Sequence, residues 1–166
     1  IAEKVNTFNL PATLPWYFDV KMLKKDTITG NGFVSVDSSN EWGPLFKILL
    51  SELVNSPNSI ILVSVKVKVS NPAKDIILAL SINKTDSVLM WRGTKLSSYY
   101  IDGNEWQTMY VAFNCIDLLK TNKNLNQLTL ISNLWNIGKG NVLVDDYKVS
   151  IKRGNPYLYG LYEPFE

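Results

Sequence analysis

Between Ile61 and Ser70 an apolar β-branched residue stands at every second position, and this period of two constrains the fold more than any other feature of the chain. In an extended strand the apolar side chains of such a segment share one face, whereas a helix would scatter them around its circumference. A second alternating segment runs from Ile76 to Asn83, after a link over residues 71–75 that has the composition of a turn. We therefore predict two strands that pair with each other in antiparallel fashion, each with one buried face.

Other strand candidates follow at short intervals and are separated by turn residues, several of them glycine. They are residues 33–37, 45–50, 88–91, 106–113, 128–132 and 142–151. The longer stretches 51–59 and 114–126 have the length of Greek-key crossings, and each has room for one helical turn. The predicted fold class is all-β: a single β-sandwich of jelly-roll type, built from two antiparallel sheets.

Length and composition support one domain over residues 1–166, and they argue against binding to nucleic acid and against insertion into a membrane. With 46% apolar residues the chain can bury a full core, and its net charge of +2 is too balanced for binding driven by nucleic-acid phosphates. It contains no apolar run of the length that a membrane-spanning helix needs, so we predict no membrane insertion by this segment. The chain does not begin with Met, and we expect it to be an excised part of a longer protein.

Of the residues that usually carry catalysis, some are absent and the others show no spacing that would single out a catalytic pair. Histidine is absent, and the one cysteine, Cys115, follows an apolar strand and is expected to be buried and inert. A glycosidase needs two carboxylates held across its substrate, yet no spacing in the sequence selects a pair. We therefore predict that the chain is not an enzyme. The carboxylates considered are Asp37, Glu41, Asp102, Glu105 and Asp145.

The last predicted strand contains two adjacent acids, Asp145 and Asp146, among β-branched residues. A carboxylate on a sheet needs a cation, a hydrogen-bond donor or water. This strand resembles the closing strand of the galactose-binding-like jelly-roll superfamily, which includes many carbohydrate-binding modules. Residues 33–37, 61–69 and 78–82 and the Glu105–Trp106 pair fit the same template, so the resemblance covers about residues 30–151.

The resemblance implies a metal ligand on the closing strand. In many such modules an acid there helps to hold a structural calcium ion, which places Asp145 first and Asp146 second as candidates; no other cofactor is implied. Calcium takes six to eight oxygen ligands, and the sequence supplies only these two evident ones. The alternative is that the acids cap a loop or pair with Lys148 or Lys152.

Aromatic side chains are the candidates for ligand binding, because Trp and Tyr rings stack on the apolar face of a sugar ring. We predict that Trp91, Tyr100 and Trp135 converge on one edge of the sandwich, with Arg92 and Asn136 supplying hydrogen bonds. For any single tryptophan, packing in the core is the alternative.

Three further tryptophans stand at predicted strand starts and are expected to pack against the core. They are Trp16, Trp42 and Trp106.

The resulting functional hypothesis is a non-catalytic, carbohydrate-binding-like accessory module of a larger extracytoplasmic protein that handles glycans, whether periplasmic, cell-surface or secreted. Its expected partners are a glycan and a neighbouring domain. The alternative is a structural or protein-interaction sandwich without a sugar site, for example the soluble tail of a membrane-bound glycan-processing protein. The aromatic tail over residues 153–166 distinguishes the two, according to whether it covers the domain's own core or forms an exposed patch.

Overall fold

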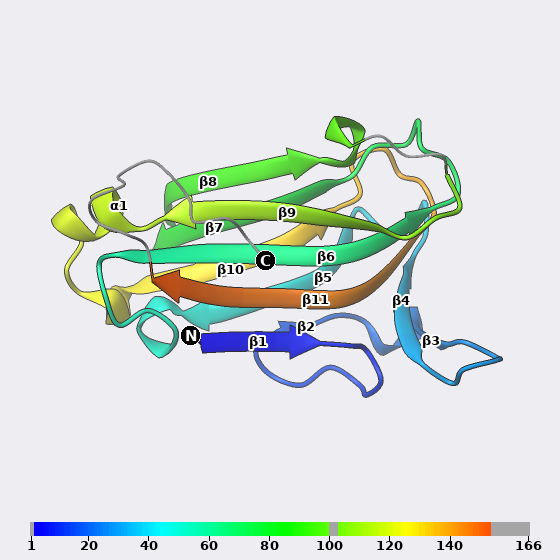
Figure 1. Ribbon diagram of the computed structural model, residues 1–166, viewed down its shortest axis with the longest axis horizontal. Coiled ribbons are helices and arrows are strands. Elements are labelled where there is room, and N and C mark those ends of the chain that lie inside the picture. Colours follow the sequence, from blue (N-terminus) through cyan, green and yellow to red (C-terminus); the bar gives the residue numbers. More distant parts are fainter. Residues whose placement is uncertain (1, 100–102, 154–166) are drawn as a thin grey trace.

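The alternating segments form the central strands of a sandwich of two antiparallel β-sheets (Figure 1). The computed structural model describes residues 2–99 and 103–153. The first sheet has the order β3 (Leu23–Lys25), β4 (Gly32–Val36), β11 (Val142–Arg153), β6 (Ser59–Val69) and β9 (Gln107–Asn114), and β1 (Ala2–Asn6) also pairs with β11. The second sheet has the order β2 (Trp16–Tyr17), β5 (Trp42–Leu49), β10 (Leu128–Trp135), β7 (Ile77–Lys84) and β8 (Ser87–Lys95).

The predicted pairing of the two alternating segments is wrong. β6 pairs with β11 and β9, whereas β7 pairs with β10 and β8, so the two strands lie in different sheets. The link over residues 71–75 therefore crosses from one sheet to the other and is not a hairpin turn. Alternation specifies which face of a strand is buried, and it does not specify the neighbouring strand.

The core lies between the two sheets and is built from the apolar faces that the alternation predicts. Val63 and Val65 of β6 are fully buried, as are Leu78 and Leu80 of β7. Trp16 is also buried, and its ring centroid lies 4.8 Å from that of Phe46 and 5.1 Å from that of Tyr147. The prediction that Trp16 packs in the core is therefore confirmed.

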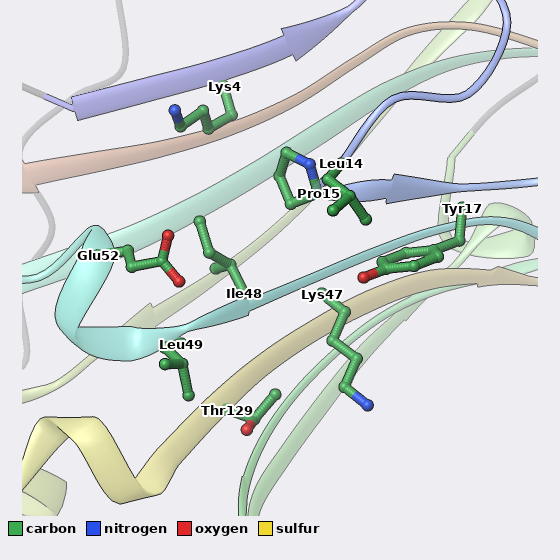
Figure 2. A pocket seen from close by; sticks show the side chains of 9 residues that line it. All are labelled: Lys4, Leu14, Pro15, Tyr17, Lys47, Ile48, Leu49, Glu52 and Thr129. Atoms are coloured by element: carbon green, nitrogen blue, oxygen red, sulfur yellow. The ribbon is translucent and has the colours of Figure 1, made fainter.

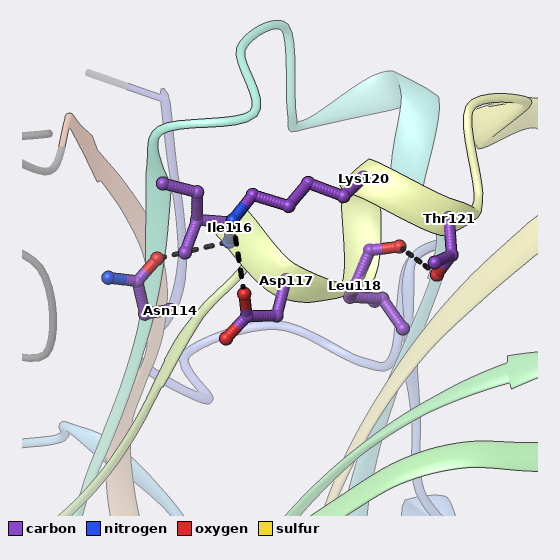
Figure 3. A network of polar contacts seen from close by, with 6 residues as sticks. All are labelled: Asn114, Ile116, Asp117, Leu118, Lys120 and Thr121. Atoms are coloured by element: carbon purple, nitrogen blue, oxygen red, sulfur yellow. Dashed lines mark hydrogen bonds and ion pairs between the residues drawn. The ribbon is translucent and has the colours of Figure 1, made fainter.

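Short helical turns connect the strands. Both predicted crossings contain one: η2 (Leu50–Glu52) in the first and α1 (Ile116–Thr121) in the second. The α1 turn is held by local contacts, among them Asn114 Oδ1 accepting from the Ile116 N–H at 3.1 Å and an Asp117–Lys120 ion pair at 3.5 Å (Figure 3). The remaining turns are η1 (Val20–Met22), η3 (Leu96–Ser98) and η4 (Leu125–Gln127).

In the two described ranges, no helix combines the length and the apolar character that crossing a bilayer requires. The hypothesis about the aromatic tail concerns residues that lie, apart from Arg153, outside the described part of the chain. The same holds for Tyr100.

Candidate functional site: an exposed sheet face with three tryptophans

The second sheet buries one side against the core and turns its other side outward. On β7, Leu78, Leu80 and Ile82 belong to the core cluster, so the alternate residues point away from it. The strand pairings extend this assignment across the sheet. We call this outward side the tryptophan face, and its residues are Tyr17, Trp42, Leu45, Lys47, Leu49, Thr129, Ile131, Asn133, Trp135, Ile77, Ala79, Ser81, Asn83, Trp91, Gly93 and Lys95.

Trp42 reaches this face because β5 contains a bulge. Leu45 pairs with Asn133 and Trp42 pairs with Trp135, so β5 has one residue more than β10 over this interval. A Cβ on Gly43 would lie 3.3 Å from the side chains of Leu134 and Val36, so that position points inward and Trp42 points outward. The Trp42 side chain is 48% exposed. Its ring stacks on that of Trp135, with 5.5 Å between centroids and 18° between planes.

Trp91 occupies the same face from the edge strand β8, where it pairs with Ser81 and is 49% exposed. Its indole lies against Gly93, two residues further along the strand, in the space that a Cβ there would take. The Cγ2 atom of Ile77 is 3.0 Å from that same position. The ring therefore extends along β8 toward Ile77, which pairs with Trp135 on its other side. Three indoles thus share one face, each mounted on a strand.

A pocket of about 410 Å³ lies at the β5 end of this face (Figure 2). Tyr17, Lys47 and Thr129 belong both to its lining and to the tryptophan face. Two charged side chains from outside the sheet, Lys4 of β1 and Glu52 of η2, complete the polar part of its wall. The pocket is thus continuous with the tryptophan face.

The structure brings together two of the predicted binding residues and separates the others. Trp91 and Trp135 lie on the tryptophan face, on β8 and β10. Arg92 points to the other side of β8, because adjacent residues on a strand face opposite ways. Its guanidinium lies 5.6 Å from the centroid of the Phe113 ring, and Nη1 donates to the Trp91 carbonyl at 3.2 Å. The expectation that Arg92 supplies hydrogen bonds beside the Trp91 ring is therefore corrected.

Asn136 is a buried structural residue and not an exposed ligand contact. Its Nδ2 donates to the carbonyl oxygens of Asp37 at 3.2 Å, Asn40 at 3.1 Å and Gly140 at 2.9 Å. Its Oδ1 accepts from the Gly140 N–H at 3.2 Å, and its own N–H donates to the Glu41 carbonyl at 2.8 Å. The amide is thus used in joining two loops beside Trp42 and Trp135.

Two of the tryptophans expected in the core are exposed. Trp42 stacks on Trp135 as described, and Trp106, just before β9, is 44% exposed. The signal for Trp42 was present in the sequence as Gly43–Pro44, because glycine and proline inside a strand mark a bulge that reverses the alternation.

The two acids of the closing strand have protein partners. Asp146 Oδ2 accepts from Lys66 Nζ at 2.7 Å, and Asp145 Oδ1 accepts from the Asp146 N–H at 2.8 Å. Desolvation raises the pKa of Asp145. Within the described ranges, no three His, Cys, Asp or Glu side chains are grouped as a metal site would need. The lysine that pairs with Asp146 is Lys66, whereas Lys148, one of the alternatives named above, pairs with Glu3 at 3.0 Å.

Cys115 is buried, and desolvation raises the pKa of its thiol to about 12. At neutral pH the thiol is therefore protonated and a poor nucleophile, as its place in the sequence predicts.

Comparison with solved structures identifies the architecture. The CBM22-1 xylan-binding domain of Xyn10C from Paenibacillus barcinonensis is similar with a TM-score of 0.53 and 11% identity, over 92% of this chain and 95% of that one. The CBM22-2 xylan-binding domain of the same protein gives 0.55 and 14%, over 90% and 98%. The C-terminal family 22 carbohydrate binding module of Clostridium thermocellum Xyn10B gives 0.51 and 12%, over 89% and 92%.

The chain has the jelly-roll fold of these modules. The predicted jelly-roll β-sandwich fold is thereby confirmed. No protein-family model matches the sequence. No curated protein matches it either. Some similar structures are parts of enzyme chains; an α-L-arabinofuranosidase with a TM-score of 0.52 is matched over 26% of its length.

Proposed function

We propose that this chain is a carbohydrate-binding module that holds a glycan on its tryptophan face. The observation that carries the proposal is the Trp42–Trp135 stack together with Trp91 on one exposed sheet face. The C–H-rich face of a pyranose stacks on such indoles, while hydroxyl groups require polar neighbours. Asn133 stands two residues before Trp135 on β10, and Ser81 pairs with Trp91. Both therefore supply polar groups beside the rings.

The spacing of the rings favours a chain of sugars over a single one. Trp135 pairs with Ile77, and Trp91 pairs with Ser81, four residues further along β7. Four residues of a strand span about 13 Å at about 3.3 Å per residue. The Trp91 ring extends back over Gly93, so the rings lie closer together than their backbones, but Trp91 and Trp135 still stand two strands, or about 10 Å, apart. Rings at that separation contact different units of an oligosaccharide.

The rings are also held in place before a ligand arrives. Trp42 and Trp135 stack on each other and the Trp91 indole lies against Gly93, so little side-chain entropy is lost when a ligand binds.

The proposed role is non-catalytic, within a larger protein that acts on glycans outside the cytoplasm. Stacking and hydrogen bonding retain a glycan without breaking a bond, and the strands place no acid on the tryptophan face. A neighbouring domain is supported by similar structures in which such a module is joined to another domain. One is a tandem of two CBM22 modules, of which this chain spans 47%, and another joins CBM22-1 to a GH10 module. A polymer such as the xylan named for these modules is encountered outside the cell.

Titration with xylohexaose, followed by tryptophan fluorescence and calorimetry, tests the proposal. Trp42→Ala, Trp135→Ala and Trp91→Ala are each expected to weaken binding about tenfold or more, because a buried aromatic contact contributes roughly 1.4 kcal/mol or more. Trp106→Ala is the matched control, since Trp106 is similarly exposed but lies off this face. Equal losses in all four variants, or none in the first three, would contradict the assignment of the face. Failure of the wild type to bind any glycan would favour an interaction domain without a sugar site.

A further inference from the structure

We propose that the tryptophan face takes an acidic glycan, one whose sugars carry carboxylate groups as uronates do, and that Lys47 and Lys95 bind those carboxylates. This inference rests on the proposed function and specifies the chemical class of its ligand. It is carried by the charges on the face and by their place in the strand register.

The tryptophan face bears two cations and no anion. Among its residues, as defined by the described strands, Lys47 and Lys95 are the charged ones, and neither makes an ion pair with another described residue. The outer side of the first sheet differs. There Lys66 Nζ lies 2.7 Å from Asp146 Oδ2 and Lys148 Nζ lies 3.0 Å from Glu3 Oε2. Two cations of the first sheet are thus paired with acids, whereas both cations of the tryptophan face lack such a partner among the described residues.

Two acids lie near the lysines, but one has its carboxylate turned away from the ammonium and the other is hydrogen-bonded to a serine. Glu52 lines the same pocket as Lys47, but Figure 2 shows its carboxylate on the opposite side of the pocket from the Lys47 ammonium. Asp75, near the end of β8, accepts hydrogen bonds from the Ser97 N–H at 3.1 Å and from the Ser97 hydroxyl at 2.8 Å. A ligand carboxylate therefore meets little competition at either ammonium.

Each lysine lies in the same cross-strand row as a tryptophan. One row runs Trp42, Trp135, Ile77, Lys95 across four strands.

In the second row the lysine is on β5 and the tryptophan is on β8; this row runs Lys47, Ile131, Ser81 and Trp91. Neighbouring strands are about 4.8 Å apart, so Lys95 lies two strands, or about 10 Å, from Trp135 at the backbone.

A sugar stacked on Trp135 thus extends its substituents toward Lys95. Lys47 lies three strands, or about 14 Å, from Trp91, so it meets a carboxylate on a neighbouring sugar unit. The four-carbon stem of lysine lets the ammonium follow a carboxylate whose position varies with the linkage. Two such rows fit an oligosaccharide in which more than one unit is charged. Because the contacts are exposed, each lysine contributes modestly and its effect is screened by salt.

The experiment uses a matched pair of ligands: xylan oligosaccharides that carry glucuronate groups, and the same oligosaccharides after reduction of the carboxyl groups to alcohols. Calorimetry at about 20 mM and about 300 mM salt measures both affinities. We expect tighter binding of the acidic form at low salt, with the preference shrinking at high salt. Lys47→Met and Lys95→Met should each reduce the preference about two- to fivefold, the range expected for exposed ion pairs, with a smaller effect on binding of the reduced form, which offers a lysine no opposite charge.

Controls separate this inference from the proposed function. Lys68→Met removes a cation from the first sheet and should leave both affinities as they are, whereas Lys47→Arg and Lys95→Arg should retain the preference. Equal binding of the two ligands by the wild type overturns the acidic ligand and leaves the carbohydrate-binding function standing. A preference that survives Lys47→Met and Lys95→Met combined overturns the role of these lysines. Binding of neither ligand removes the proposed function and this inference with it.

Discussion

Single residues decide how the tryptophan face is assembled. One extra residue in β5, accommodated at Gly43, turns Trp42 outward so that it can stack on Trp135. Asn136 then ties the loops on either side of this stack through its amide and its backbone N–H. Asn136 is a positioning residue, since its polar atoms are used within the protein.

Asp145 gives a prediction at the same scale, on pH dependence. Desolvation is the main cause that raises its pKa, so the folded protein holds this proton more tightly than the unfolded chain does. Its contribution to the free energy of unfolding is therefore favourable at low pH and is lost as the pH rises through the raised pKa. Asp145→Asn should make the protein more stable than the wild type at pH 7, with the difference vanishing near pH 3; urea unfolding in the presence of a chelator measures it.

Asp37→Asn is the control with the opposite sign. Hydrogen bonds from the Ser39 hydroxyl and N–H lower the pKa of Asp37, so its stabilising contribution is present above the ordinary Asp range and is lost as the pH falls through the lowered pKa. A loss of stability in Asp145→Asn at pH 7 would contradict the desolvation argument. Stabilisation of the wild type by added calcium, absent in Asp145→Asn, would instead support the calcium prediction.

At the scale of elements, alternation predicts strands well and their partners poorly. The valine face of residues 61–69 and the leucine face of residues 76–82 are buried as predicted, yet the two strands lie in different sheets. β8 also continues through Gly93, where the sequence suggested that it ended. The reason is that Trp91 covers this glycine, so an aromatic ring from the same strand fills the space that a side chain would occupy.

Gly93→Ala tests this arrangement. The new methyl group would displace the Trp91 indole, so glycan affinity should fall about three- to tenfold while the free energy of unfolding changes by less than about 1 kcal/mol. Binding calorimetry measures the affinity, chemical unfolding measures the free energy of unfolding, and tryptophan emission reports the displacement of the Trp91 indole. Thr94→Ala alters the opposite side of the same strand and should leave affinity and emission unchanged. Unaltered affinity in Gly93→Ala would show that the seating of Trp91 on Gly93 does not matter for binding.

For the whole molecule, a buried polar contact joins the two sheets in the middle of an apolar core. Ser132 of β10 donates its hydroxyl proton to the Ala79 carbonyl at 2.9 Å, and the Tyr147 hydroxyl of β11 lies 2.8 Å from Ser132 Oγ. Since the serine proton is already used, Tyr147 is the donor to Ser132. Burial raises the pKa of Tyr147, so its hydroxyl stays protonated and able to donate.

This geometry predicts unequal effects of removing either hydroxyl. Ser132→Ala leaves the buried Tyr147 hydroxyl without its acceptor and should lower the free energy of unfolding by about 1–3 kcal/mol. Tyr147→Phe leaves Ser132 its bond to Ala79 and should lower it by only about 0.5–1.5 kcal/mol. The double variant should lose less than the sum, because no orphaned hydroxyl remains. Urea unfolding of the three variants measures this, and a larger loss in Tyr147→Phe than in Ser132→Ala would contradict the assignment of donor and acceptor.

The sequence by itself determined the all-β class, the two-layer sandwich and the buried faces of its central strands, because side-chain alternation is a local property that any extended chain must satisfy. It also pointed to Trp91 and Trp135 as rings that lie outside the core. Only the tertiary structure decided that Trp42 joins them, that Arg92 turns away and that Asn136 is interior. A bulge, a change of sheet or a closed loop depends on residues distant in the chain, and each one reverses or relocates side chains that the local pattern would otherwise place.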